Sequence, residues 1–296
     1  PLDILFVFTA NPEDYTNRGS IVTPLKDRIE SQILTHYPKS LEHALEITAQ
    51  EAGISQEQAS RVKISDLVKR LIEQIAFEAR GSEFVDKKSG VSSRLSISAY
   101  ENAISAAERR AIINKEKQTQ VWIADLSGII PSITGKVELV YEGEQDGPFQ
   151  VAMNLLDKAI RSQFVQFFPN PDTLKKRRST GKPSQQEKED ENPYRSIINW
   201  FDKGNHLNIS FNTSDKDKML LLYKVDGLHA LVKKYFAQAN ETQAALLMEF
   251  VLHGLAAYSL ISKKIFESNI EFKDLIGSMM NLEGGKGYED EFDEEA

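Results

Sequence analysis

Residues 65–81 read SDLVKRLIEQIAFEARG, and they carry every local signal of one amphipathic helix. Ser65 belongs to the residue types that cap helix N-termini, and Gly81 belongs to those that end helices. Between them, apolar side chains recur at intervals of three and four residues, which places them on one face. They are Leu67, Val68, Leu71, Ile72, Ile75 and Ala79. The stretch therefore predicts a core helix that needs other helices around it.

Similar signals flank this helix and predict a helical subdomain over about residues 40–140. One helix is predicted at 41–52, with Ser40 as its N-cap, and another at 98–114, with a capping box of Ser98 and Glu101. A third is predicted to begin at Asp125 and to be kinked by Pro131. Tyr100, Ile104, Ala107 and Ala111 give the second of these its apolar stripe.

The second half of the chain is also predicted to be helical. Gly147-Pro148 opens an amphipathic helix to Phe167, because proline suits the first helical turn. Further helices are predicted from Pro193, from 227 behind the cap Asp226, and from 241 to about Glu267 behind Asn240 and Gln243. Residues 206–211 alternate, which leaves a short strand and an extended loop both open.

Two short segments near the start of the sequence resemble strands. Residues 4–8 (ILFVF) are uniformly apolar, as in a strand buried on both faces, and 31–36 (SQILTH) form a second candidate. Two strands cannot make a stable sheet alone, so they are expected to pair with strands from further polypeptide. The predicted fold class is mainly α, with remnant strands of an α/β core.

Composition narrows the function classes. The sequence is 41% hydrophobic and 27% charged, with a net charge of −8, as in an ordinary globular protein. The acidic balance argues against nucleic-acid binding, and the basic run KKRR at 175–178 is read as part of a solvated linker. The absence of cysteines excludes disulfides and thiolate metal sites. Together with the lack of a signal peptide, it is compatible with a cytoplasmic protein.

The longest apolar run, residues 244–262, has the length of a membrane span but contains Glu249 and His253. It is therefore predicted to be a buried helix. The two side chains lie four residues apart on one helix face, a spacing that could bind a metal, but two ligands are too few for zinc. A hydrogen-bonded pair in the core is the favoured interpretation, and no metal site is predicted.

Residues 9–29 raise a functional question, because two polar groups follow the first strand. Asn11 lies at the tip of the strand, where open α/β sheets bind ligands. Arg28 has a guanidinium that can hold a phosphate with two hydrogen bonds. Asn-Pro is also a common turn starter, so spacing alone leaves both a structural and a functional interpretation open.

The order of three motifs resembles a known family. FTANPEDY (8–15), TPLKDRI (23–29) and GVSSRLSISAYENAISAAERRAII (90–113) are similar to the sensor-1 strand, the segment after it and the sensor-2 element of AAA+ ATPases. The relevant clade contains the MoxR proteins and the ATPase subunit of magnesium chelatase. The resemblance covers residues 1 to about 140, and Ile29 replaces the usual phenylalanine.

The resemblance implies roles for three residues. Asn11 would be the sensor-1 residue that positions the attacking water. Arg28 would be the arginine finger that reaches the nucleotide of a neighbouring subunit. Arg94 would be sensor 2, which binds the nucleotide cofactor of its own subunit. Asn11 and Arg28 would be the catalytic residues. Arg18 has no family role and is read as a surface arginine.

The family's Walker A loop and Walker B carboxylates are missing. G-x-x-x-x-G-K-[ST] has no match, since Gly135-Lys136 precedes valine and Gly181-Lys182 precedes proline. The chain is thus expected to be the C-terminal portion of a longer AAA+ protein and inactive alone, with ATP and Mg²⁺ bound only in the full protein. The resemblance further implies a ring of identical subunits, expected to be a hexamer, and a partner with a von Willebrand factor A domain. The alternative is a non-catalytic adaptor that lends Arg28 to an active ATPase.

The expected organisation has six parts: 1–38, the end of the AAA+ core; 39–145, the helical lid; 146–168, a connecting helix; 169–192, a flexible linker; 193–282, a C-terminal helical region; and 283–296, an acidic tail. The tail is read either as a partner-binding peptide or as a solvated end.

Overall fold

The structure is a computed structural model that describes residues 4–9, 27–87, 89–172 and 192–275. The chain divides into two units, Pro1–Pro38 and Lys39–Ala296, and each is described by itself. Residues 173–191 of the predicted linker (169–192) and the acidic tail lie outside the described residues.

In the first unit, the two predicted strands are not formed. Residues 4–8 have no strand partner among the described residues. Their side chains are exposed, Leu5 at 88% and Val7 at 80%, and Ile33 in the second segment is exposed at 90%. A strand is stabilised by hydrogen bonds to a neighbour, and the described part of the chain supplies none to either segment. The prediction that 4–8 is a strand paired with further polypeptide therefore stays a prediction, and within the described residues the segment is exposed and unpaired.

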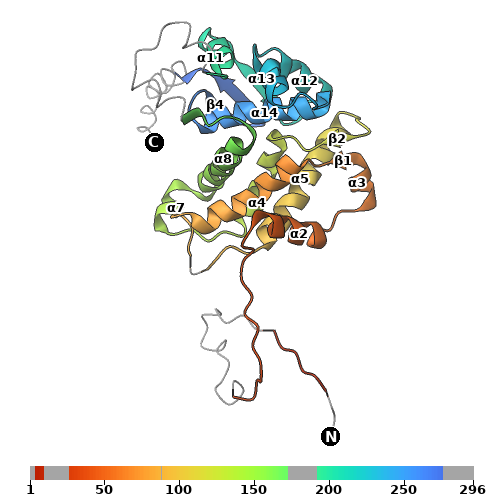
Figure 1. Cartoon of the computed structure of the whole chain (residues 1–296), viewed down its shortest axis with the longest axis vertical. Helices are drawn as coiled ribbons and strands as arrows, with labels where there is room; N and C mark the ends of the chain where they lie inside the picture. Colours follow the sequence, from red (N-terminus) through yellow and green to blue (C-terminus); the bar gives the residue numbers. More distant parts are fainter. Residues whose placement is uncertain (1–3, 10–26, 88, 173–191, 276–296) are drawn as a thin grey trace, which may run out of the picture. The chain divides into compact units, whose positions relative to one another are not determined.

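The second unit is mainly helical, which confirms the predicted fold class at that level (Figure 1). Its first half contains α2 (Leu41–Glu51), α3 (Gln56–Arg61), α4 (Asp66–Gly81), α5 (Arg94–Ile113), the 3₁₀ helix η1 (Ala124–Ile129), α6 (Ile130–Thr134), α7 (Tyr141–Asp146) and α8 (Pro148–Phe167). Its second half contains α11 (Arg195–Asp202), α12 (Asp215–Tyr223), α13 (Leu228–Tyr235) and α14 (Glu241–Ala257).

Two small sheets accompany the helices. β1 (Val62–Lys63) and β2 (Thr119–Gln120) form one parallel pair. β3 (Leu207–Ser210), β4 (Ser262–Phe266) and β5 (Asn269–Lys273) form an antiparallel sheet in the order β3-β5-β4. Of the strand and the extended loop left open at 206–211, the strand is formed, as β3, whereas the β4–β5 hairpin was not predicted.

Local capping sets the boundaries of the helices that were predicted best. The Ser65 hydroxyl accepts a hydrogen bond from the Val68 amide at the start of α4, and Ser40 accepts one from His43 at the start of α2. The predicted apolar face of α4 is buried throughout. Asn240 and Gln243 form the predicted capping box of α14.

Other boundaries differ from the prediction. Helix α5 begins at Arg94 rather than behind Ser98, because Leu95, Ser96 and Ala99 already bury one face of an earlier turn. The Glu101 carboxylate accepts a hydrogen bond from the Gly53 amide at 2.8 Å instead of closing a capping box. The predicted kinked helix is in fact two helices, because η1 ends at Ile129 and α6 begins at Ile130 with Pro131 in its first turn.

Two further boundaries in the second half were also misplaced. The N-cap of α13 is Gly227, whose φ of 77° suits glycine, rather than Asp226. Helix α14 ends at Ala257 and not near Glu267, because Ser259 adopts a φ of 53° and the hairpin follows. In the hairpin, alternate side chains such as Ile270 and Phe272 are buried, which is the period of a strand and not of a helix.

One hydrophobic core runs through both halves of the second unit. Helix α8 packs on α4 on one side and on α14 on the other, so it joins the halves (Figure 1). At the crossing with α14, a Cβ on Gly254 would lie 2.1 Å from the Phe164 ring. Glycine is thus required there for the two helices to approach each other.

Helix α14 is a core helix, as predicted, with twelve buried residues. In the described part of the chain, no helix has both the length and the apolarity that crossing a bilayer would require.

Candidate functional site

The structure places the predicted site residues differently. Asn11 lies outside the described residues. Arg28 belongs to the first unit and is exposed in a turn. Arg94 belongs to the second unit, where it is the exposed first residue of α5.

Arg94 has an unfavourable local position. Its backbone amide donates to the Ser92 hydroxyl at 3.2 Å, but its side chain makes no hydrogen bond or ion pair with other described residues. The first turn of α5 contains no acidic residue. A positive side chain at a helix N-terminus is disfavoured by the helix dipole by about 0.3–1 kcal/mol. The position of Arg94 is therefore not explained by the stability of α5.

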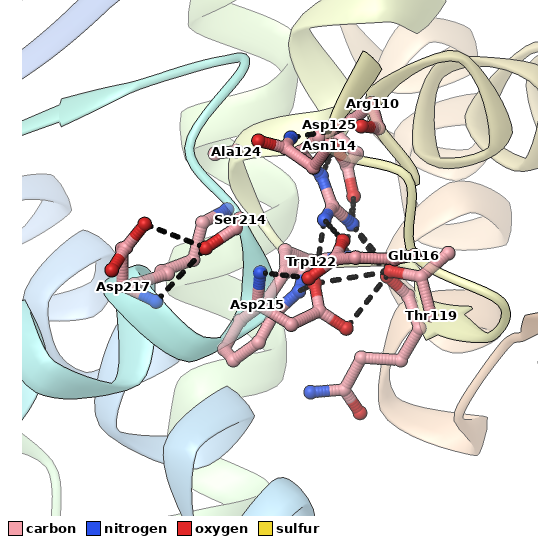
Figure 2. A network of polar contacts seen from close by, with 12 residues as sticks. Arg110, Asn114, Glu116, Thr119, Trp122, Ala124, Asp125, Ser214, Asp215 and Asp217 are labelled. Carbon is pink, nitrogen blue, oxygen red and sulfur yellow. Dashed lines mark hydrogen bonds and ion pairs between the residues drawn. The ribbon is translucent and has the colours of Figure 1, made fainter. Parts of the chain in front are cut away.

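A network of polar contacts surrounds Arg110, a residue that was not predicted (Figure 2). Arg110 lies near the end of α5 with its side chain 1% exposed. Its Nε donates to Asp125 Oδ1 at 3.0 Å, and its Nη1 donates to Asp215 Oδ1 at 2.5 Å. Its Nη2 donates to Thr119 Oγ1 and to the Gln120 carbonyl, both at 2.9 Å. We call Arg110, Glu116, Thr119, Trp122, Asp125 and Asp215 the Arg110 cluster.

Asp215 is the member of the cluster that comes from the second half of the unit. It is the first residue of α12, where the helix dipole favours a carboxylate. Besides Arg110, its carboxylate accepts hydrogen bonds from the Trp122 indole at 2.7 Å and from the Thr119 hydroxyl at 2.9 Å. Its backbone amide donates to Glu116 Oε1 at 2.8 Å. Asp215 is thus held by four residues that lie about 100 positions earlier in the chain.

The carboxylates of Glu116, Asp125 and Asp215 all lie around the Arg110 guanidinium. This arrangement shifts the pKa of Arg110 and that of Glu116. Burial alone would lower the pKa of Arg110, but Asp125 and Asp215 raise it overall. Burial raises the pKa of Glu116, and the nearby negative charge of Asp215 acts in the same direction. Glu116 Oε2 lies 3.7 Å from the Arg110 Nη1 and has no hydrogen-bond partner among the residues that the structure describes.

A second buried ion pair lies beside the cluster. Glu249 of α14 and Lys218 of α12 are both fully buried, with 3.4 Å between Oε1 and Nζ. The Glu249 carboxylate also accepts hydrogen bonds from the amides of Ile123 at 2.8 Å and Ala124 at 3.3 Å, where η1 begins. Lys218 Nζ lies 4.8 Å from the centre of the Trp122 ring. Burial raises the pKa of Glu249, and Lys218 acts in the opposite direction. We call this arrangement the Glu249 clamp.

The predicted hydrogen-bonded pair of Glu249 and His253 is not formed. Glu249 binds Lys218 and two backbone amides instead. In the described part of the chain, neither ring nitrogen of the buried His253 has a hydrogen-bond partner. The His253 ring packs edge-on against Phe272, with 5.2 Å between centroids. Helical spacing placed the two residues on one face, but nearby backbone amides and Lys218 compete for the carboxylate. Within the described ranges, no group of three His, Asp or Glu residues is placed to hold a metal ion.

His253 predicts a measurable loss of stability in mild acid. Burial, together with Lys263 and Lys218, lowers its pKa well below 6.5 in the folded state. The unfolded chain therefore binds a proton that the folded chain does not, and stability falls as the pH drops below about 6.5, by up to about 1.4 kcal/mol per pH unit. Urea unfolding between pH 7.5 and 5 should show that His253→Leu removes this part of the pH dependence. The exposed His43→Leu should leave it in place, and equal slopes in the parent and His253→Leu would contradict the assignment.

The signal that could have revealed the Arg110 cluster is the position of Arg110 on α5. It lies three residues after Ala107, so a charged residue interrupts the buried stripe that contains Ala99, Ala103 and Ala107. Such a residue must be paired. Its partners could not be deduced, because Asp215 is 105 residues away.

No family model, curated protein or solved structure matches the chain. The function is therefore inferred from the position of Arg94 and from the resemblance of the motifs at 8–15, 23–29 and 90–113.

Proposed function

We propose that the chain is the sensor and lid portion of an AAA+ ATPase of the MoxR and magnesium chelatase clade. In this proposal, ATP hydrolysis in an oligomeric ring drives the remodelling or maturation of a partner protein. Arg28 would act on the nucleotide of the neighbouring subunit and Arg94 on that of its own subunit. The ring and a partner with a von Willebrand factor A domain belong to the same proposal.

The observation that carries the proposal is the position of Arg94. It is exposed at the first turn of a helix whose dipole disfavours it, and its side chain has no partner among the described residues. A phosphate group at this end of the helix would supply the missing negative charge. A sensor-2 arginine has this position, at the start of a lid helix.

The exposed segments of the first unit agree with the same proposal. Residues 4–8 and 31–36 expose large apolar side chains, and neither segment has a strand partner among the described residues. Pairing with strands supplied by further polypeptide would bury them. That polypeptide would also carry the Walker A and Walker B motifs.

ATP and Mg²⁺ do not fit the chain by itself. Its sequence has no glycine-rich loop of the Walker A type to surround phosphates, and its described residues contain no acidic cluster for a metal. In this proposal, nucleotide binding would use residues from outside this sequence. The alternative function, a non-catalytic adaptor that lends Arg28 to an active ATPase, places those residues in a different protein.

The first experiment is to isolate the native protein from its source cells with an antibody against residues 193–275, and to measure its intact mass and its ATP hydrolysis. A chain substantially heavier than this one, with ATPase activity, would support the proposal. A chain of the same mass without activity would favour the adaptor.

In the active protein, Arg94→Ala is expected to lower turnover by about 100-fold, the cost of removing one transition-state donor. The matched control is Arg109→Ala, since Arg109 is exposed on the same helix. Equal turnover of the two variants would remove Arg94 from the nucleotide site.

A further inference from the structure

Helix α5 connects the two features described above. Arg94 is its first residue, and Arg110 lies sixteen residues later. At a rise of 1.5 Å per residue, this is a distance of about 24 Å along one continuous helix. A displacement of the Arg94 end therefore moves the Arg110 cluster with it.

The end of α5 is held to the second half of the unit by directed polar contacts. Arg110 binds Asp215, and the Asn114 side chain donates to the Asn212 carbonyl at 2.8 Å. The Gln120 side chain donates to the carbonyl of Thr242 at 3.1 Å, next to the start of α14. The Glu249 clamp adds the contact with η1.

These contacts resist sliding more strongly than an apolar interface would. Arg110 and Glu249 are shielded from water, and each has a partner across the junction: Asp215 for Arg110, and the amides of Ile123 and Ala124 for Glu249. A shift of α12 by one turn would leave buried charges unpaired, which is strongly unfavourable. The continuous core through α8 and α14 adds close packing on the other side.

We propose that residues 193–275 move with residues 39–145 as one rigid body, and that the contact between Arg110 and Asp215 transmits the movement of α5 to α12. Arg110 is thus a positioning residue. The three-stranded sheet and α11–α14 would be the part that carries nucleotide-driven movement of the lid towards a partner. The nucleotide input rests on the proposed function, whereas the rigid junction does not.

The junction can be tested in the chain as it is, because the sequence has no cysteine. Ser105→Cys on α5 and Lys234→Cys on α13 place spin labels at two exposed positions in the two halves. Pulsed electron paramagnetic resonance then measures the distance distribution between the labels. A single narrow distribution is expected.

The decisive comparison is between two asparagine substitutions on α12. Asp215→Asn removes the charge that faces Arg110, and a broadened or shifted distribution is expected. Asp217→Asn makes the same chemical change two residues later in α12, at an exposed position whose side chain points away from Arg110 (Figure 2). In this variant, the narrow distribution is expected to persist. Circular dichroism establishes that both variants are folded. If Asp215→Asn does not fold, Asn114→Ala removes the contact with Asn212 and takes its place.

The outcomes separate the two proposals. A broad distribution in the parent chain would overturn the rigid junction. Identical distributions in the two asparagine variants would overturn the role of the contact between Arg110 and Asp215. In the native ATPase, the distance should not change when a non-hydrolysable ATP analogue is added, and a change would also overturn it. If the native protein has no ATPase activity but the distance distribution between the labels is narrow, the rigid junction stands. Only the proposal that nucleotide drives its movement is then excluded.

Discussion

Arg110→Met is expected to lower the free energy of unfolding by about 3–5 kcal/mol, the usual cost of removing one partner from a buried ion pair. The substitution keeps much of the side-chain volume but leaves Asp125 and Asp215 without their shared cation. Urea denaturation at pH 7 measures the change. Arg109→Met, at the exposed neighbouring position, should stay within about 0.5 kcal/mol of the parent.

The cause of the loss can be separated from lost packing. If unpaired charge is the reason, adding Asp125→Asn and Asp215→Asn to Arg110→Met should restore part of the stability. A loss below about 1 kcal/mol for Arg110→Met, within the range of exposed pairs, would mean that the carboxylates are compensated in another way.

Arg28→Ala is expected to lower ATP turnover of the proposed full-length protein by about 10³-fold or more, while nucleotide binding is preserved. The reason is that an arginine finger stabilises charge that develops only in the transition state. Turnover measured by phosphate release and binding measured with a fluorescent ATP analogue give the two quantities.

The control for this variant is Arg18→Ala, in the same part of the sequence and without an expected role. Because the finger acts on a neighbouring subunit, mixing Arg28→Ala chains with chains that cannot bind ATP should restore some turnover. Equal loss in binding and turnover would assign Arg28 to nucleotide binding instead, and no loss would remove it from the site.

The helices that could be predicted are those whose signals lie within a few residues of each other. Ser65 and Gly81 enclose α4, and the box of Asn240 and Gln243 starts α14. The failures involve distant partners. The segment of β4 was predicted as the end of α14, but it is a strand because it pairs with β5, which also pairs with the distant β3.

The candidate site follows the same division. Arg28 and Arg94 could be proposed because the order of short motifs is visible in the sequence. The Arg110 cluster could not, since Arg110 reaches Asp215 across 105 positions. For Glu249, helical spacing indicates His253, whereas its partners are Lys218, 31 positions earlier, and two amides about 125 positions earlier.

The Glu249 clamp has a consequence for the order in which the chain folds. The N-cap residue of η1, Ile123, makes no side-chain hydrogen bond that caps the helix. The amides of Ile123 and Ala124 instead donate to the Glu249 carboxylate of α14. During synthesis, residues 119–134 emerge long before Glu249, so these amides depend on water until α14 has been made. Contacts of such large sequence separation form slowly. The junction between the halves is therefore completed late, when α14 docks, and residues 39–145 reach their final structure only after synthesis has passed Ala257.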